Sequence, residues 1–115
     1  MKLVGAIIQP TKLDTVLEAL KKIQVTRLTV YDAQGFGRQR GQTEVYRGRE
    51  YRNMLLRKVA LEIMVNDDFL DRTLETLSNV ARTGAEGNIG DGKVFVLPAE
   101  QTVQISDGCQ GPGAV

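Results

Sequence analysis

The chain has 115 residues, of which 42% are hydrophobic and 25% charged, and its formal net charge is +1. These values are typical of one ordinary globular domain, and they argue against bulk nucleic-acid binding and electrostatic attachment to membranes. No apolar run approaches the ~20 residues of a membrane span, and the absence of histidine with a single cysteine, Cys109, excludes histidine-based triads, most zinc sites and an internal disulfide.

The first half of the chain predicts a strand, a helix and a second strand. Residues 3–8 form a short apolar run that ends before Pro10, as expected for a buried strand. A helix follows, with Thr11 as its candidate N-cap. Its apolar stripe consists of Leu13, Val16, Leu17, Leu20 and Ile23. Residues 28–31 are β-branched and aromatic, which predicts the second strand.

The second half repeats this order. Residues 59–65 are predicted to form a strand, and the three residues that follow it, 66–68, are all candidate N-caps for a helix. The buried face of that helix is predicted to contain Leu70, Leu74, Leu77 and Ala81. Residues 93–97 form the fourth predicted strand, which Pro98 ends.

Two successive strand–helix–strand units predict one α+β domain over residues 1–115, with a ferredoxin-like βαββαβ sandwich. In this arrangement both helices cover one face of a four-stranded antiparallel sheet. The strands carry apolar residues on both faces, so we expect the uncovered face to contact other subunits.

A long segment without a clear period joins the two halves, from about residue 35 to residue 55. Such segments are uncommon in a compact domain unless they are functional or disordered. This one carries arginines and tyrosines, the residues most typical of interface anchors: Arg38, Arg40, Arg47, Arg49, Arg52, Tyr46 and Tyr51. We therefore expect it to contact a target protein. A solvated hairpin tip and a nucleic-acid-binding loop are the alternatives.

The connection between the second helix and the fourth strand is rich in glycine and ends in Gly-Asp-Gly-Lys at residues 90–93. Glycines expose backbone N–H groups to an anion, and Lys93 adds a positive charge, so a phosphate would fit here. The spacing of a Walker loop is missing. A plain glycine-rich connection is the alternative.

Several motifs together resemble those of the PII nitrogen-regulatory signal-transduction proteins. They are Ala-Ile-Ile-Gln-Pro at residues 6–10, Gly-Phe-Gly-Arg-Gln-Arg-Gly at 35–41, Thr-Glu-Val-Tyr-Arg-Gly at 43–48, Ala-Arg-Thr-Gly at 81–84 and Ile-Gly-Asp-Gly-Lys-Val-Phe-Val at 89–96. The resemblance runs from residue 1 to about residue 97. It implies a cytoplasmic homotrimer that binds ATP or ADP in clefts between subunits.

The resemblance also assigns names and roles to segments and residues. It implies a target-binding T-loop at about residues 37–55 and a B-loop at about residues 82–92. The implied nucleotide site consists of Thr29, Gly37, Arg38, Gln39, Met64, Gly90, Asp91, Gly92 and Lys93, with Lys93 on a phosphate. Gln39 would help to hold Mg²⁺ beside ATP and, with Gly41 and Lys58, would bind 2-oxoglutarate. Tyr51 matches a tyrosine that some branches uridylylate.

The same resemblance implies a regulator of a target transporter or enzyme, with no catalytic residue, no prosthetic group and no nucleic-acid partner. Slow ATP hydrolysis is the enzymatic alternative, with Gln39, Lys58 and Glu62 near the predicted site. A structural trimer that has lost its ligands is a further alternative.

Three departures from the family pattern alter the expected ligands. The B-loop is three residues longer, and the uncharged Gln104 and Ser106 stand where the family usually has two arginines for the phosphates. Gln9 and Thr11 replace a usual basic residue and a usual Phe beside the 2-oxoglutarate pocket. We therefore predict a preference for ADP or AMP over ATP, because fewer cations face the γ-phosphate. Bicarbonate, as in carbon-linked branches, is the alternative effector.

The last residues of the sequence, 106–115, are rich in glycine and proline, so we expect a flexible tail. We interpret Cys109 as incidental, and an intermolecular disulfide is the alternative.

Overall fold

The computed structural model describes residues 1–36 and 55–115. Its strands are β1 (Lys2–Ile8), β2 (Thr29–Phe36), β3 (Leu55–Val65) and β4 (Gly92–Pro98), and its helices are α1 (Leu13–Lys22) and α2 (Asp67–Ala81). Short 3₁₀ turns lie at Pro10–Lys12 and Gly111–Ala114. The order along the chain is therefore βαββαβ, as predicted.

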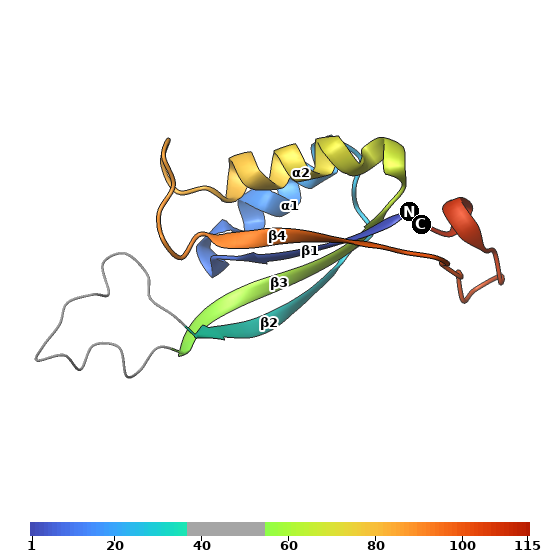
Figure 1. Cartoon of the computed structure of the whole chain (residues 1–115), viewed down its shortest axis with the longest axis horizontal. Helices are drawn as coiled ribbons and strands as arrows, with labels where there is room; N and C mark the ends of the chain where they lie inside the picture. Colours follow the sequence, from blue (N-terminus) through green and yellow to red (C-terminus); the bar gives the residue numbers. More distant parts are fainter. Residues whose placement is uncertain (37–54) are drawn as a thin grey trace, which may run out of the picture.

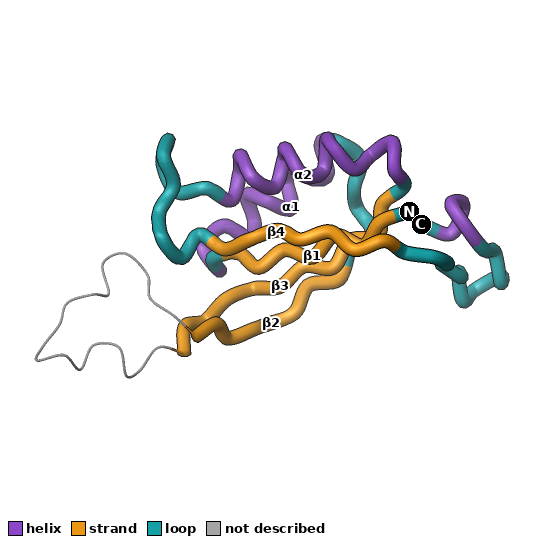
Figure 2. Tube along the Cα trace, in the orientation of Figure 1, coloured by secondary structure: helices purple, strands orange, loops and turns teal. Residues whose placement is uncertain are grey.

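The four strands form one sheet in the order β2-β3-β1-β4, and all neighbouring strands are antiparallel. Both helices lie on the same side of this sheet (Figure 1). Figure 2 shows the resulting two layers, with the strands below the pair of helices. The predicted ferredoxin-like α+β architecture is confirmed.

The core lies between the sheet and the two helices. Its buried members are Val4, Ala6, Ile8, Val16, Leu20, Val25, Val59, Leu61, Ile63, Val65, Leu77 and Ala81. Cross-strand register places Val4 beside Ile63 on one side and Val96 on the other, so alternate residues of each strand point to the helices. Burial of this apolar surface stabilises the two-layer arrangement.

The strands at the centre of the chain are longer than predicted. β2 continues to Phe36 and β3 already begins at Leu55, because these two residues pair with each other in the ladder. Asp, Gln and Gly residues in β2 have low strand propensity, but pairing with β3 outweighs that local preference. Local propensity therefore predicted that β2 ends too early and that β3 begins too late.

Two details of the helices differ from the predictions. Thr11 is not the N-cap of α1, since it lies inside the 3₁₀ turn and the helix begins two residues later, at Leu13. Thr73 is fully buried in α2 although it is polar. Its hydroxyl donates to the Phe69 carbonyl at 2.7 Å, which satisfies the polar group inside the core.

The face of the sheet without helices is partly apolar. Tyr31, Phe95 and Leu97 are each exposed by close to half of their surface. The ring of Phe95 lies directly over Gly5 of the neighbouring strand, where a β-carbon would collide with it. Exposed aromatic and aliphatic side chains on an uncovered sheet face are the kind of surface that another subunit covers.

Candidate functional site

The predicted site residues within the described part of the chain fall into two groups at opposite ends of the sheet. Gly90–Lys93 and Lys58 lie at the end where β1 finishes, since Gly92 pairs with Ile8. Thr29 and Met64 lie at the other end, where β2 begins and β3 finishes. Figure 1 shows the B-loop at one end of the sheet and both chain ends at the other.

Asp91 organises the B-loop through three hydrogen bonds. Its carboxylate accepts from the Thr83 N–H at 2.9 Å, the Thr83 hydroxyl at 2.5 Å and the Asn88 N–H at 2.9 Å. Desolvation raises the pKa of Asp91, but these hydrogen bonds and the charge of Lys12 outweigh it, so the pKa lies below its ordinary value. The predicted ligand residue is thus an ionised group that fixes the two sides of the loop.

All four glycines of the B-loop, at positions 84, 87, 90 and 92, have backbone conformations that other residues rarely adopt. Gly90 has φ 97° and Gly92 has φ 109°. At Gly92 a β-carbon would also collide with the Ile7 carbonyl oxygen, so only glycine lets the loop approach β1 this closely. The B-loop follows the C-terminal end of α2, so any anion here would rely on loop N–H groups and lysines and not on a helix N-terminus.

Lys58 is the buried cation of this end of the sheet. Only 6% of its surface is exposed, and its ammonium group donates to the Gly90 carbonyl at 2.5 Å. Burial lowers the pKa of Lys58, and the nearby Asp91 carboxylate partly offsets this effect. The predicted effector residue is therefore not a solvated charge at a strand end, since it contacts the B-loop itself.

The longer B-loop forms one wall of a cavity on the helix side of the sheet. The cavity has a volume of about 320 Å³. Its lining includes the core residues Ile8 and Leu77, the loop residues Glu86 and Gly87, and Lys93. The extra residues of the loop therefore pack beside the second helix and away from the uncovered face.

A second cavity lies at the other end of the sheet and has a volume of about 440 Å³. That value is within the range of roughly 300–1,000 Å³ that is usual for small-molecule sites. Thr29 and Met64, both predicted nucleotide residues, line this cavity together. The remaining lining residues are Leu3, Arg27, Leu28, Glu62, Ala114 and Val115. Its mixture of apolar walls and a few polar groups suits a planar ring with polar edges.

Five predicted site residues lie outside the described residues: Gly37, Arg38, Gln39, Gly41 and Tyr51. Their predicted roles in nucleotide, Mg²⁺ and effector binding and in modification stay predictions. In residues 1–36 and 55–115, no cluster of three or more histidine, cysteine or acidic side chains is placed to hold a metal ion. Within the same ranges, no helix has the length and apolar character needed to cross a membrane.

Sequence reasoning missed the residues that the end of the chain brings to the second cavity. Arg27 donates to the Val115 carbonyl at 3.3 Å, although 88 positions separate the two. Asn66 carried a local signal, as a candidate N-cap, but that signal did not predict its contact with Pro112. The expected flexibility of residues 106–115 stays a prediction, and the structure gives these residues defined partners.

Gln104 and Ser106, for which the resemblance implies a loss of two phosphate-binding cations, contact each other. The Gln104 side-chain amide donates to the Ser106 hydroxyl at 3.2 Å. This segment therefore presents a neutral polar pair where the resemblance would place two cations.

Comparison of the sequence with known proteins identifies one family and several full-length relatives. The chain matches the family described as "Nitrogen regulatory protein P-II" over residues 1–108. It is 46% identical to the nitrogen regulatory protein GlnK1 of Methanosarcina mazei, over 100% of this chain and 97% of that protein. It is also 46% identical to the nitrogen regulatory protein P-II of Azospirillum brasilense and 45% identical to P-II 1 of Escherichia coli, over the full length of both chains in each case.

Proposed function

Because this chain belongs to the nitrogen regulatory protein P-II family, we propose that it is a trimeric cytoplasmic regulator that binds adenine nucleotides between subunits. Its relatives are named as regulatory proteins and not as enzymes. In this proposal the ligands set the conformation of the T-loop, and the T-loop regulates a target transporter or enzyme.

The separation of the two residue groups supports a site between subunits. Met64 and Lys58 lie six positions apart on β3, which corresponds to about 20 Å along a strand. Residues so far apart in one chain are poorly placed to surround one nucleotide. We propose that Thr29 and Met64 of one chain contact the base, while Gly90–Lys93 of the next chain contact the phosphates.

The neutral pair of Gln104 and Ser106 supports a preference for ADP or AMP over ATP. Hydrogen bonds to charged groups are roughly twice as strong as neutral ones, so two missing cations weaken phosphate binding. The γ-phosphate carries the densest charge and loses most. The protein would then respond to the ratio of these nucleotides.

The small anionic effector is the second part of the proposal. The names of the relatives point to nitrogen regulation, for which 2-oxoglutarate is the expected ligand. Gln9 and Thr11 leave the pocket without a usual cation, and a dicarboxylate needs cationic partners to offset its desolvation. Bicarbonate, with one charge, tolerates that loss better and is the competing effector.

Calorimetric titration of the purified protein tests both the nucleotide preference and the identity of the anionic effector. ATP, ADP and AMP are titrated separately, with Mg²⁺ present, and then again in the presence of 2-oxoglutarate or bicarbonate. We expect tighter binding of ADP or AMP than of ATP and a change in affinity with only one of the two effectors. Absence of binding by all three nucleotides would contradict the proposed function.

A further inference from the structure

The last five residues of the sequence fold back onto the end of the sheet that carries Thr29 and Met64. Residues 99–115 leave β4, turn at Gly108 and return, and the Gly111 N–H donates to the Thr102 carbonyl at 2.9 Å. The 3₁₀ turn at Gly111–Ala114 follows. We call residues 111–115 the terminal turn.

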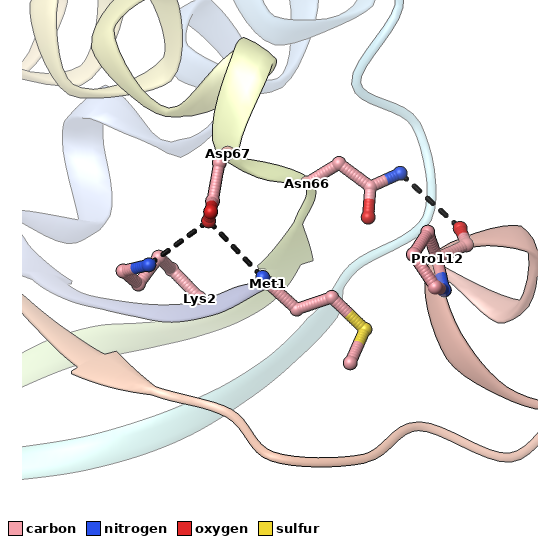
Figure 3. Close-up of polar contacts among 5 residues, drawn as sticks. All are labelled: Met1, Lys2, Asn66, Asp67 and Pro112. Atoms are coloured by element: carbon pink, nitrogen blue, oxygen red, sulfur yellow. Dashed lines mark hydrogen bonds and ion pairs between the residues drawn. The ribbon is translucent and has the colours of Figure 1, made fainter.

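Two side chains from the body of the domain hold the terminal turn. Arg27, just before β2, donates to the Val115 carbonyl at 3.3 Å, and Asn66, just before α2, donates to the Pro112 carbonyl at 3.2 Å. Figure 3 shows the Asn66 side chain directed toward Pro112, while Asp67 faces the Met1 amino group and Lys2. Arg27 also lines the second cavity, and Asn66 lies two positions after Met64, which lines it too.

Ala114 and Val115 line that cavity together with the candidate base contacts Thr29 and Met64. The cavity of about 440 Å³ exists with the terminal turn in place, so the turn bounds the space and does not fill it. Two small apolar side chains and a methionine in the same lining suit the faces of a purine, which is planar and apolar on both sides.

The side chain of Asn66 contacts the terminal turn and does not cap its own helix. Asn66 occupies the N-cap position of α2, where asparagine normally accepts a hydrogen bond from the helix, yet its side chain makes no such bond. Its Oδ1 atom is buried without a hydrogen-bond partner among the described residues. Release of the terminal turn would let the Asn66 side chain reorient so that its Oδ1 atom caps α2.

From these contacts we infer that the terminal turn is a clamp on the nucleotide base, in which Ala114 and Val115 close the base pocket and Asn66 and Arg27 position them. This inference rests on the proposed function. Base and clamp stabilise each other, because each buries apolar surface of the other. The terminal turn therefore contributes to nucleotide affinity in addition to the B-loop and the T-loop.

Removal of the terminal turn tests the clamp. The full-length protein and a variant that ends at Gln110 are titrated with ADP, and we expect the Kd to rise about tenfold in the shortened protein. Asn66→Ser keeps a good N-cap residue but cannot reach Pro112, so a smaller rise of about threefold is expected. Asp68→Ser, in the same first helical turn, is the matched control and should bind ADP as the full-length protein does.

Hydrogen exchange of residues 111–115 provides a readout that does not depend on affinity. Saturating ADP should slow exchange at the Gly111 amide in the full-length protein, and less so in Asn66→Ser. If the full-length protein binds ADP and the shortened variant binds it equally or more tightly, the clamp is wrong while the proposed function stands. If the full-length protein binds no adenine nucleotide, both are wrong. Unchanged elution volume and melting temperature verify that each variant is folded.

Discussion

The ammonium group of Lys58 donates a hydrogen bond to the carbonyl of Gly90, so a buried side chain in the middle of the chain holds the glycine-rich loop near its end. Replacement Lys58→Met removes the cation and leaves the Gly90 carbonyl without this donor. We expect nucleotide affinity to fall about tenfold, because the loop loses both a positive charge and an anchor. Stability should change by only about 1 kcal/mol, since removal of a buried charge offsets the lost bond.

Titration of Lys58→Met with ADP, beside denaturant unfolding, measures both effects. Lys22→Met removes an exposed lysine at the end of α1 and serves as the control. Equal affinity of both variants would mean that Lys58 has only a structural role.

Two glycines of the B-loop, Gly84 and Gly92, should differ sharply when replaced by alanine. At Gly92 the new β-carbon would collide with the Ile7 carbonyl, at φ 109°, and we expect a loss of about 3 kcal/mol or more. At Gly84, with φ 71°, no atom lies within 4 Å of the new β-carbon, so the cost should be near 1 kcal/mol. Urea unfolding of the two variants gives the comparison, and equal losses would contradict the close approach at Gly92.

The carboxylate of Asp91 should contribute to stability in a pH-dependent way. Its pKa is lower in the folded protein than the ordinary value of about 3.9. Its contribution is therefore fully present above that ordinary value and is lost as the pH falls through the lowered folded pKa. Asp91→Asn should be less stable than the unchanged protein at neutral pH, by about 1 kcal/mol for each lost hydrogen bond.

Unfolding of both proteins across the acid range measures this difference. The gap between them should narrow as the pH falls into the region of the folded pKa. A gap that stays constant with pH would contradict an ionised Asp91 in the B-loop. Asp107→Asn, an exposed acceptor in the tail, is the control.

Restoration of two cations should shift the nucleotide preference. The double variant Gln104→Arg and Ser106→Arg replaces the neutral pair with two guanidinium groups. We expect ATP affinity to rise about tenfold more than ADP affinity, because the additional phosphate carries most of the added charge contact. Gln101→Arg, at an exposed position of the same segment, is the control. An equal gain for ATP and ADP in calorimetry would contradict the assignment.

The uncovered face of the sheet should carry the subunit contacts. Phe95→Glu places a charge on this face, where the Phe95 ring covers Gly5 of β1. A buried unpaired charge is strongly unfavourable, so we expect a trimer to dissociate. Ile105→Glu, at a position 97% exposed in the tail, should not change the assembly. Light scattering after size exclusion gives the mass, and an intact trimer in Phe95→Glu would contradict this role.

Local patterns in the sequence predicted those parts of the protein that local chemistry controls. Strand and helix order followed from apolar periodicity, and the tight B-loop followed from Gly90 and Gly92. Predictions were weaker where distant segments meet. β2 and β3 extend to Phe36 and Leu55 because the strands pair, and the burial of Lys58 depends on a loop that lies 32 positions further along the chain.

The base pocket could not be predicted from local patterns for the same reason. Its walls come from four separate segments, and the hydrogen bond between Arg27 and Val115 joins residues that lie 88 positions apart. The resemblance did indicate Thr29 and Met64, but it did not indicate the contacts of residues 111–115. Contacts of the tail with the folded domain are tertiary, and they appear only in the structure.

The placement of the two residue groups at opposite ends of one sheet has a genetic consequence. In the proposed trimer each chain contributes its B-loop to one cleft and its Thr29 end to a different cleft. A variant defective in the B-loop and a variant defective in the base pocket would each be inactive alone. In a mixed trimer, however, one cleft combines the intact base pocket of one variant with the intact B-loop of the other. Co-expression of the two inactive variants should therefore restore ligand binding at one cleft of every trimer that contains both.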